Sequence, residues 1–168
     1  MEAKVSIIMG STSDLDVMSK AAKLLEEFEI PFEMNALSAH RTPDEVEKFA
    51  KGAKDRGIKV IIAGAGMAAH LPGVIAAMTP LPVIGVPIKA SLEGFDSVMS
   101  IVQMPPGIPV ATVAVNGAMN AAILALQVMA TGDEELMQKM VDYKESLKQK
   151  IVNANKELSE VKYKFKTN

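Results

Sequence analysis

Short apolar runs alternate with segments of helical periodicity along most of this chain, and this alternation most constrains how it can fold. We interpret the runs as strands, and they cover residues 5–9, 32–37, 60–63, 82–86 and 109–115. Several are apolar at nearly every position, which is typical of strands buried on both faces of a parallel sheet. Strand–helix–strand units with right-handed crossovers then predict a three-layer α/β/α sandwich.

Helices are expected between the strands, at residues 14–29, 44–56, 69–79 and 118–131. In the first of them, apolar residues recur at spacings of three and four from Leu15 to Phe28. This spacing gives a helix one stripe that faces a core. Pro43 stands at the expected first turn of the second helix, where proline is best tolerated.

The composition fits one globular domain and excludes several classes of function. The chain has 168 residues, 49% of them hydrophobic, and a net charge of −2, which gives no general attraction to nucleic acid or acidic membranes. It has no cysteine, so disulfides, thiolate metal sites and a cysteine nucleophile are excluded. We expect a soluble protein of the cytoplasm with no nucleic-acid or membrane partner, since no apolar stretch is long enough to span a bilayer.

The C-terminal segment differs from the rest because it is charged and predicts one long amphipathic helix, from Asp133 to about Lys162. Such a helix either folds back on its own domain or packs on a neighbouring subunit. The twelve methionines favour the second interpretation, because thioethers fill irregular interfaces well. We therefore expect residues 1–132 to form the α/β domain and residues 133–168 to form an extension that packs on a neighbouring subunit.

Three loops stand where ligands bind in open parallel sheets, directly after a strand. In the first, Ser11, Ser13 and Asp14 open a helix. Hydroxyls and free N–H groups there suit a phosphate, and Asp14 suits a ribose diol. The structural alternative is a serine N-cap followed by an acidic first turn.

The second loop holds Ser38, His40 and Arg41, and His40 is one of only two histidines. A guanidinium can bind phosphate bidentately while the adjacent imidazole gives and takes a proton near neutral pH. The structural alternative is a histidine that merely caps a carbonyl, with Arg41 on the surface.

The third loop is almost free of side chains apart from Met67, and it leads to the second histidine, His70. Backbone N–H groups can approach a flat ligand closely there and can wall a small, dry pocket. Close packing of a strand on a helix is the structural alternative. No histidine–carboxylate cluster has the spacing of metal ligands, so no metal site is expected.

These loops, in this order, resemble the family of N5-carboxyaminoimidazole ribonucleotide mutases, enzymes of purine biosynthesis. The resemblance runs from about Val5 to Leu136 and rests on four stretches. They are Met9–Asp14 (except Thr12), Ser38–Pro43, Ala63–Gly73 (except Met67), and Ser100–Pro105 continued by Gly107–Val110. Many relatives have glycine at Met67, and the connection from Ile88 to Gly94 is a residue shorter here than is usual.

The resemblance implies a flavodoxin-like subunit in a homo-octamer, with active sites at subunit contacts and the C-terminal helix reaching a neighbour. It implies transfer of a carboxylate from the exocyclic nitrogen N5 of an aminoimidazole ribonucleotide to ring carbon C4, through release and recapture of CO2, without metal, ATP or organic cofactor. It also implies a role for each matching residue, with His40 as the catalytic acid and base and His70 as catalytic support. The residues implied to bind the substrate are Ser11, Ser13, Asp14, Ser38 and Arg41. The backbone implied to form a CO2 pocket is that of Gly64, Ala65, Gly66 and Ala68.

Two other functions remain open. The related carboxylase, which adds free CO2 to aminoimidazole ribonucleotide, typically carries lysine at the position of Arg41 and lacks the loop before His70. A non-catalytic module that binds a mononucleotide or flavin is less consistent with the sequence, because a flavin usually lies against aromatic side chains and none stands in the three loops.

Overall fold

In the computed structural model, which describes residues 2–168, one parallel sheet organises the chain up to Met129. Its strands pair in the order β2-β1-β3-β4-β5, and every pair is parallel. The strands are β1 (Val5–Met9), β2 (Phe32–Ala36), β3 (Val60–Gly66), β4 (Val83–Ile88) and β5 (Ala111–Thr112). This is the flavodoxin-like order, in which the direction of winding changes between β1 and β3.

The central strands are buried on both faces, as their apolar sequences predict. Every residue of β1 and of β4 is buried, as is all of β3 except its last residue, Gly66. The register places Ile7 opposite Ile62 and Ile62 opposite Ile84, so β-branched side chains stack across the sheet. The edge strand β2 is only partly buried.

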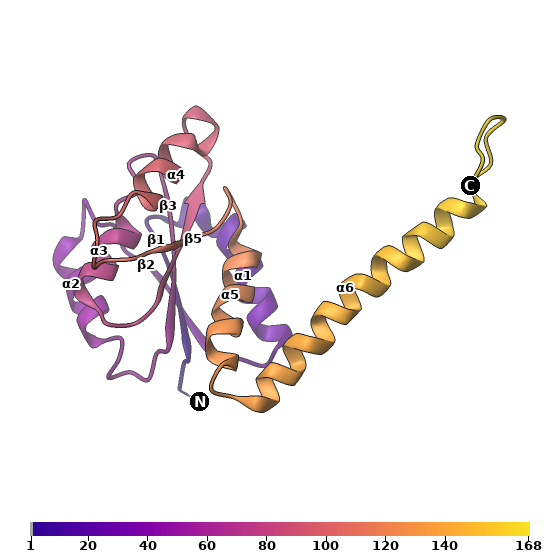
Figure 1. Cartoon of the computed structure of the whole chain (residues 1–168). Coiled ribbons are helices and arrows are strands. Elements are labelled where there is room, and N and C mark those ends of the chain that lie inside the picture. The colour runs from indigo at the N-terminus through magenta and orange to yellow at the C-terminus, as the bar shows by residue number, and fades with distance from the viewer. Residues whose placement is uncertain (1) are drawn as a thin grey trace. The chain divides into compact units, whose positions relative to one another are not determined.

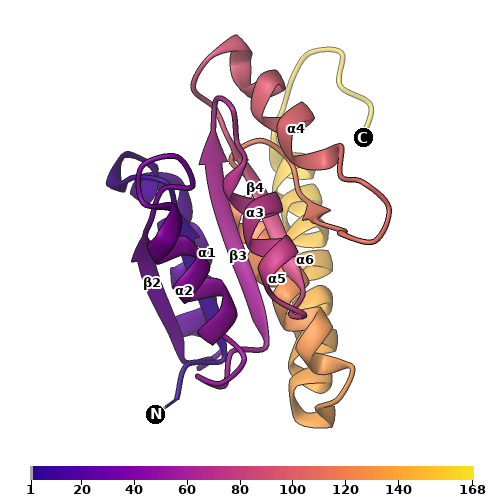
Figure 2. The same ribbon diagram turned by 90° about the vertical axis from the view of Figure 1, so that its left-hand side faces the viewer.

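Helices cover both faces of this sheet (Figure 1), and the predicted three-layer sandwich is confirmed. Helices α1 and α5 lie on one face and α2, α3 and α4 on the other, the face that Figure 2 turns toward the viewer. The helices of this part are α1 (Leu15–Glu27), α2 (Pro43–Gly52), α3 (Leu71–Met78), α4 (Phe95–Val102) and α5 (Ala118–Ala130), with short 3-10 turns η1 (Thr12–Asp14) and η2 (Leu92–Gly94).

Two glycines let helices approach the sheet closely. A Cβ on Gly85 would lie 2.5 Å from Cγ2 of Ile101 in α4, and a Cβ on Gly64 would lie 2.5 Å from Sδ of Met18 in α1. On the α2–α4 face, the core also includes Ile8, Phe49 and Ile75. Gly64 and Gly85 therefore serve the packing of opposite layers.

The structure differs most from the sequence-based expectation at α4 and β5. Helix α4, which has eight residues, was not predicted; it begins after a left-handed Gly94 (φ 87°), a conformation that the sequence does not reveal. The expected strand over 109–115 reduces to Ala111–Thr112 in β5. Beyond β5, Val113 donates to Gly85 and Asn116 to Pro87, so the chain follows β4 without a regular ladder.

Residues from Ala130 to Asn168 form a second compact unit. Helix α6 (Glu134–Glu160) confirms the long amphipathic helix expected there. Its N-cap is Asp133, whose carboxylate accepts a hydrogen bond from Leu136 N at 3.0 Å. Across residues 2–168, none of the helices is both apolar and long enough to cross a bilayer.

Candidate functional site

Three loops meet at the carboxyl edge of the sheet, where β2, β1 and β3 end side by side. Two hydrogen bonds join them: Arg41 donates from Nη2 to the carbonyl of Gly10 at 3.1 Å, and His40 Nε2 lies 2.9 Å from His70 Nδ1. The first bond connects the loops after β2 and β1, and the second connects those after β2 and β3. The structure therefore brings together the three segments that the sequence singled out, at the point where the strand order reverses.

The two imidazoles form the centre of this edge. Their ring centroids are 5.0 Å apart and the rings are nearly perpendicular, at 78°. One of the two facing nitrogens must carry a proton and the other a lone pair, so the contact fixes one tautomer relative to the other. Both side chains are exposed, and His70 occupies the N-cap position of α3.

The loop after β2 holds Arg41 in place by a set of local hydrogen bonds. The hydroxyl of Ser38 accepts from the backbone N of Arg41 at 3.2 Å and from its Nε at 3.3 Å. Thr42 closes the turn, because its hydroxyl accepts from Ser38 N at 2.9 Å and donates to Ser38 O at 3.1 Å. The guanidinium is thus directed at the loop after β1, where it can face an anion.

In the loop after β1, the serine hydroxyls already make local bonds. Ser11 Oγ accepts from Ser13 N at 3.3 Å and caps η1, as the structural alternative predicts. Ser13 Oγ donates to Asp14 Oδ1 at 3.3 Å. Burial raises the pKa of the Asp14 carboxyl, and the hydrogen bonds from Ser13 and at Ser11 offset this only in part.

The segment after β3 divides into a buried half and an exposed half. Gly64 and Ala65 are buried, with Gly64 against Met18, so close packing accounts for this glycine. Gly66 is half-buried and Ala68 is exposed at the edge. A Cβ on Gly66 would lie 3.4 Å from Cβ of Ala90, so the loop after β4 borders this segment directly.

That bordering loop contains polar residues that were not predicted as part of a site. Lys89 follows β4 immediately, its backbone N donates to Asn116 Oδ1 at 3.0 Å, and its ammonium pairs with Glu93. A cation directly after a buried strand is the sequence signal that points to Lys89. Among residues 2–168, no three histidine, cysteine or acidic side chains gather in a way that could hold a metal ion.

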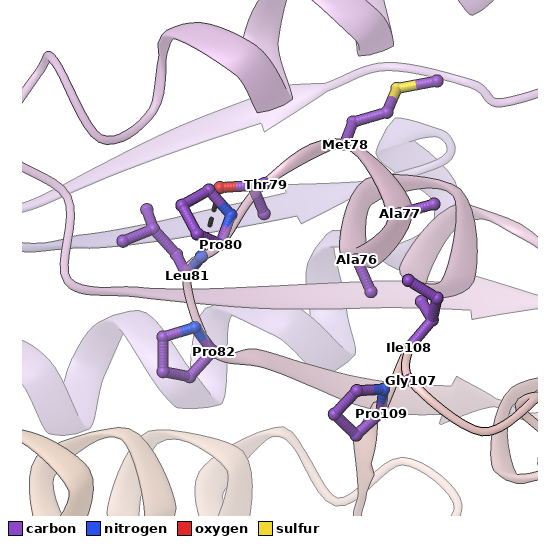
Figure 3. A pocket seen from close by; sticks show the side chains of 10 residues that line it. All are labelled: Ala76, Ala77, Met78, Thr79, Pro80, Leu81, Pro82, Gly107, Ile108 and Pro109. Carbon is purple, nitrogen blue, oxygen red and sulfur yellow. Dashed lines mark hydrogen bonds between the residues drawn. The ribbon is translucent and has the colours of Figure 1, made fainter.

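A hollow of about 660 Å³ lies elsewhere, where α3 leads into β4 and where the chain approaches β5. Figure 3 shows its lining, which runs from Ala76 to Pro82 and from Gly107 to Pro109. Its polar side chain, Thr79, accepts a hydrogen bond from Leu81 N at 3.3 Å. Without an ionisable group in its lining, this hollow offers no acid or base, and the histidine-bearing edge remains the candidate site.

The parallel sheet and the loops at the carboxyl ends of its strands define a flavodoxin-like α/β protein with a candidate ligand site after β1, β2 and β3. A model of the AIR carboxylase family matches residues 4–150. The chain therefore belongs to the AIR carboxylase family.

Individual relatives carry two different names. The chain is 60% identical to the N5-carboxyaminoimidazole ribonucleotide mutase of Pyrococcus abyssi, over 86% of this chain and 84% of that protein. It is 54% identical to the phosphoribosylaminoimidazole carboxylase of Candida glabrata, over 95% of this chain but 28% of that protein. A crystal structure of a Treponema denticola PurE2 variant superimposes with a TM-score of 0.86 at 30% identity, over 94% of this chain and 99% of that one.

Proposed function

We propose that the protein is an isomerase of purine biosynthesis that converts N5-carboxyaminoimidazole ribonucleotide to 4-carboxy-5-aminoimidazole ribonucleotide. The observation that carries this proposal is the joining of three loops around His40 and His70, with Arg41 beside the first loop. It gives one edge both an acid–base group and a cation for a phosphorylated ligand. The identity with the Pyrococcus abyssi mutase over most of both chains supports the same reaction.

The substrate's phosphate and ribose are assigned to the loops after β1 and β2. Arg41 binds the phosphate, assisted by the hydroxyls of Ser11, Ser13 and Ser38, which exchange their present local bonds for bonds to the anion. Asp14 accepts from the ribose hydroxyls. A ligand that donates to this carboxylate opposes the effect of its burial, because hydrogen bonds stabilise the charged form.

His40 carries the proton in both halves of the reaction. The bond between N5 and the carboxylate carbon breaks, its electron pair remains on N5, and His40 donates a proton there as CO2 forms. The C4 carbon then attacks CO2, and His40 removes the C4 proton after the new bond has formed. Proton donation and removal by one group require a pKa near neutrality, which imidazole has intrinsically. His70 holds the His40 ring through the 2.9 Å contact.

The released CO2 stays beside the backbone of the third loop. Gly66 and Ala68 lie at the edge itself, and Gly64 and Ala65 form the buried floor behind them. CO2 is small and uncharged, so a dry wall of small residues retains it without a specific contact. Retention avoids a second encounter between enzyme and CO2 from solution.

Direct carboxylation by free CO2 is the second candidate, favoured by the name of the Candida glabrata relative. The chain spans only 28% of that protein, however, so its name describes a much longer chain. The deciding assay compares N5-carboxyaminoimidazole ribonucleotide with aminoimidazole ribonucleotide plus bicarbonate at low enzyme concentration. Faster product formation from the N5-carboxylated compound supports the mutase, and product from the second mixture alone contradicts it.

We also propose assembly into a homo-octamer in the cytoplasm, with α6 packed on a neighbouring subunit. An apolar stripe of η2 and α4, made of Leu92, Phe95, Met99 and Val102, is exposed in the single chain and supports association. Along α6, Val141, Leu147 and Ile151 are exposed as well. Size-exclusion chromatography with light scattering tests the octamer, and the particle mass after truncation at Gly132 tests the role of α6.

A further inference from the structure

Met67 is the one long side chain between the end of β3 and the second histidine, and its backbone adopts a conformation that methionine disfavours. Its φ is 57°, in the left-handed region, and its side chain is 59% exposed. An L-residue pays a conformational cost in this region that glycine does not pay. A large apolar residue that is both strained and solvent-exposed contributes little to the stability of the fold, so its role lies elsewhere.

The loop around Met67 is anchored on both sides. Ala65 and Ala69 are buried in the core cluster beneath α2, α3 and α4, and His70 N donates to Ala68 O at 2.8 Å. These anchors fix where the Met67 backbone lies, at the carboxyl edge of β3. Met67 is thus an exposed residue of the same segment after β3 that carries the exposed His70, three residues further on.

We infer that the Met67 side chain is a cover over the reacting end of the substrate, which keeps released CO2 inside the site. This inference rests on the proposed mutase reaction. Gly66 and Ala68 on either side of Met67 are too short to close an exposed edge. A thioether on a flexible, unbranched side chain can lie across a flat ligand and exclude water from it. Its sulfur is only a weak hydrogen-bond acceptor and adds no strong nucleophile to the site.

The cover acts between the two bond changes of the transfer. Once the N5–carbon bond has broken and N5 has taken its proton, CO2 carries no charge by which the site could hold it. It either reacts with C4, which then gives up its proton, or escapes to solvent. Closing the edge raises the share that reacts, because the partners remain at high effective concentration.

The test measures escape directly. Unlabelled N5-carboxyaminoimidazole ribonucleotide is converted in buffer containing 13C-bicarbonate and carbonic anhydrase, and the label in the product is determined by mass spectrometry at low conversion. We expect little 13C label in the product formed by the unmodified protein. The label in the product should increase about tenfold with Met67→Gly and with Met67→Ala, because escape of CO2 then competes with its capture by C4. Met67→Leu, which keeps an apolar side chain of similar reach, is expected to incorporate as little label as the full chain.

Met34→Ala is the matched control, since Met34 is also an exposed methionine but lies in the middle of β2. Glycine accepts a φ of 57° without cost, so Met67→Gly should melt no lower than the full chain. Unchanged label in both Met67→Gly and Met67→Ala overturns the inference while leaving the mutase reaction standing. High label with the unmodified chain overturns it as well. If the unmodified chain does not convert the N5-carboxylated substrate at all, the proposed function itself is wrong.

Discussion

His40 Nε2 lies 2.9 Å from His70 Nδ1, although thirty residues separate them in the sequence. Since the rings meet nearly at right angles, the contact is a hydrogen bond between ring nitrogens rather than a stack. One facing nitrogen donates its N–H and the other accepts it through a lone pair, so the tautomer of one ring sets the tautomer of the other.

Replacing His40 separates chemistry from binding. His40→Asn is expected to lower kcat by about 10²- to 10⁴-fold, because it removes the proposed acid and base. The affinity for the ribonucleotide, measured by calorimetry, should remain nearly unchanged, since Arg41, the proposed phosphate ligand, keeps its bond to Gly10. A variant with full rate would show that another group carries the proton.

His70 is expected to act through His40 as a positioning residue. His70→Ala removes the partner of His40 Nε2 and should lower kcat by about tenfold, the value of one hydrogen bond, with little change in KM. His70→Asn places an amide group near the position of Nδ1 and should restore part of the loss. Equal kcat values for the two variants would contradict a role through this hydrogen bond.

Arg41 tests the proposed phosphate contact. Arg41→Ala should weaken binding of the ribonucleotide by about 10- to 100-fold, the range for a hydrogen-bonded charge. The same change should leave the weaker binding of the unphosphorylated ribonucleoside unaltered. If both ligands lose affinity equally, Arg41 supports the loop after β1 through Gly10 rather than binding phosphate.

The free energy of unfolding is predicted to depend on pH through the Asp14 carboxyl. Burial raises the pKa of its carboxyl in the folded chain above the ordinary value of 3.8. The folded state then holds this proton more tightly than the unfolded state, so the stabilisation from protonation is complete below the ordinary value and is lost as pH rises through the raised folded pKa. At neutral pH, the ionised Asp14 therefore costs stability.

Asp14→Asn should accordingly raise the free energy of unfolding near neutral pH, by less than about 1 kcal/mol because solvent screens this partly exposed group. The gain should shrink as pH falls toward the ordinary pKa. Urea titrations of both proteins across this range measure the difference. Lower stability of Asp14→Asn at neutral pH would mean that the hydrogen bonds at Ser11 and Ser13 outweigh burial.

Two glycines in the sheet should differ in their tolerance of a methyl group. Gly85→Ala should cost about 1–3 kcal/mol, because its Cβ would lie 2.5 Å from a branched carbon of Ile101 and 3.1 Å from Val110. Gly64→Ala should cost less, since the atom in its way is the sulfur of Met18, on a flexible chain that can move aside. Thermal unfolding of the two variants in parallel checks the order, and the reverse order would contradict this account.

The sequence predicts a strand well where the strand is buried on both faces of the sheet. Residues 5–9 match β1 because an apolar run closed by Gly10 has clear limits, whereas β3 extends three residues beyond its predicted end, to Gly66. Glycine and alanine in residues 64–66 carry no strand signal, and only pairing with neighbouring strands makes them a strand, with β4 throughout and with β1 at Gly64. Helix α4 was not predicted for a related reason, since so short a helix depends on its packing against the sheet at β3, β4 and β5.

The sequence predicts which loops form the candidate site, but not how their side chains are arranged in space. Strand ends and loop chemistry single out Ser38, His40 and Arg41, and a parallel sheet places their loop beside those of β1 and β3. The pairing of His40 with His70 depends on the angle at which each loop leaves its strand, which no local pattern encodes. The left-handed backbone of Met67 is likewise invisible in the sequence, because its loop is held by the burial of Ala65 and Ala69.

The histidine-bearing edge is built entirely from loops that precede residue 71, whereas the exposed apolar stripe of η2 and α4 begins at Leu92. The proposed proton chemistry and the proposed subunit contacts of this stripe therefore lie in separate stretches of the sequence. Mutations that remodel how copies of the chain associate can accumulate in the second stretch without altering the residues that handle the substrate. Descendants of one ancestral sequence can thus diverge in quaternary arrangement while their acid–base apparatus stays the same.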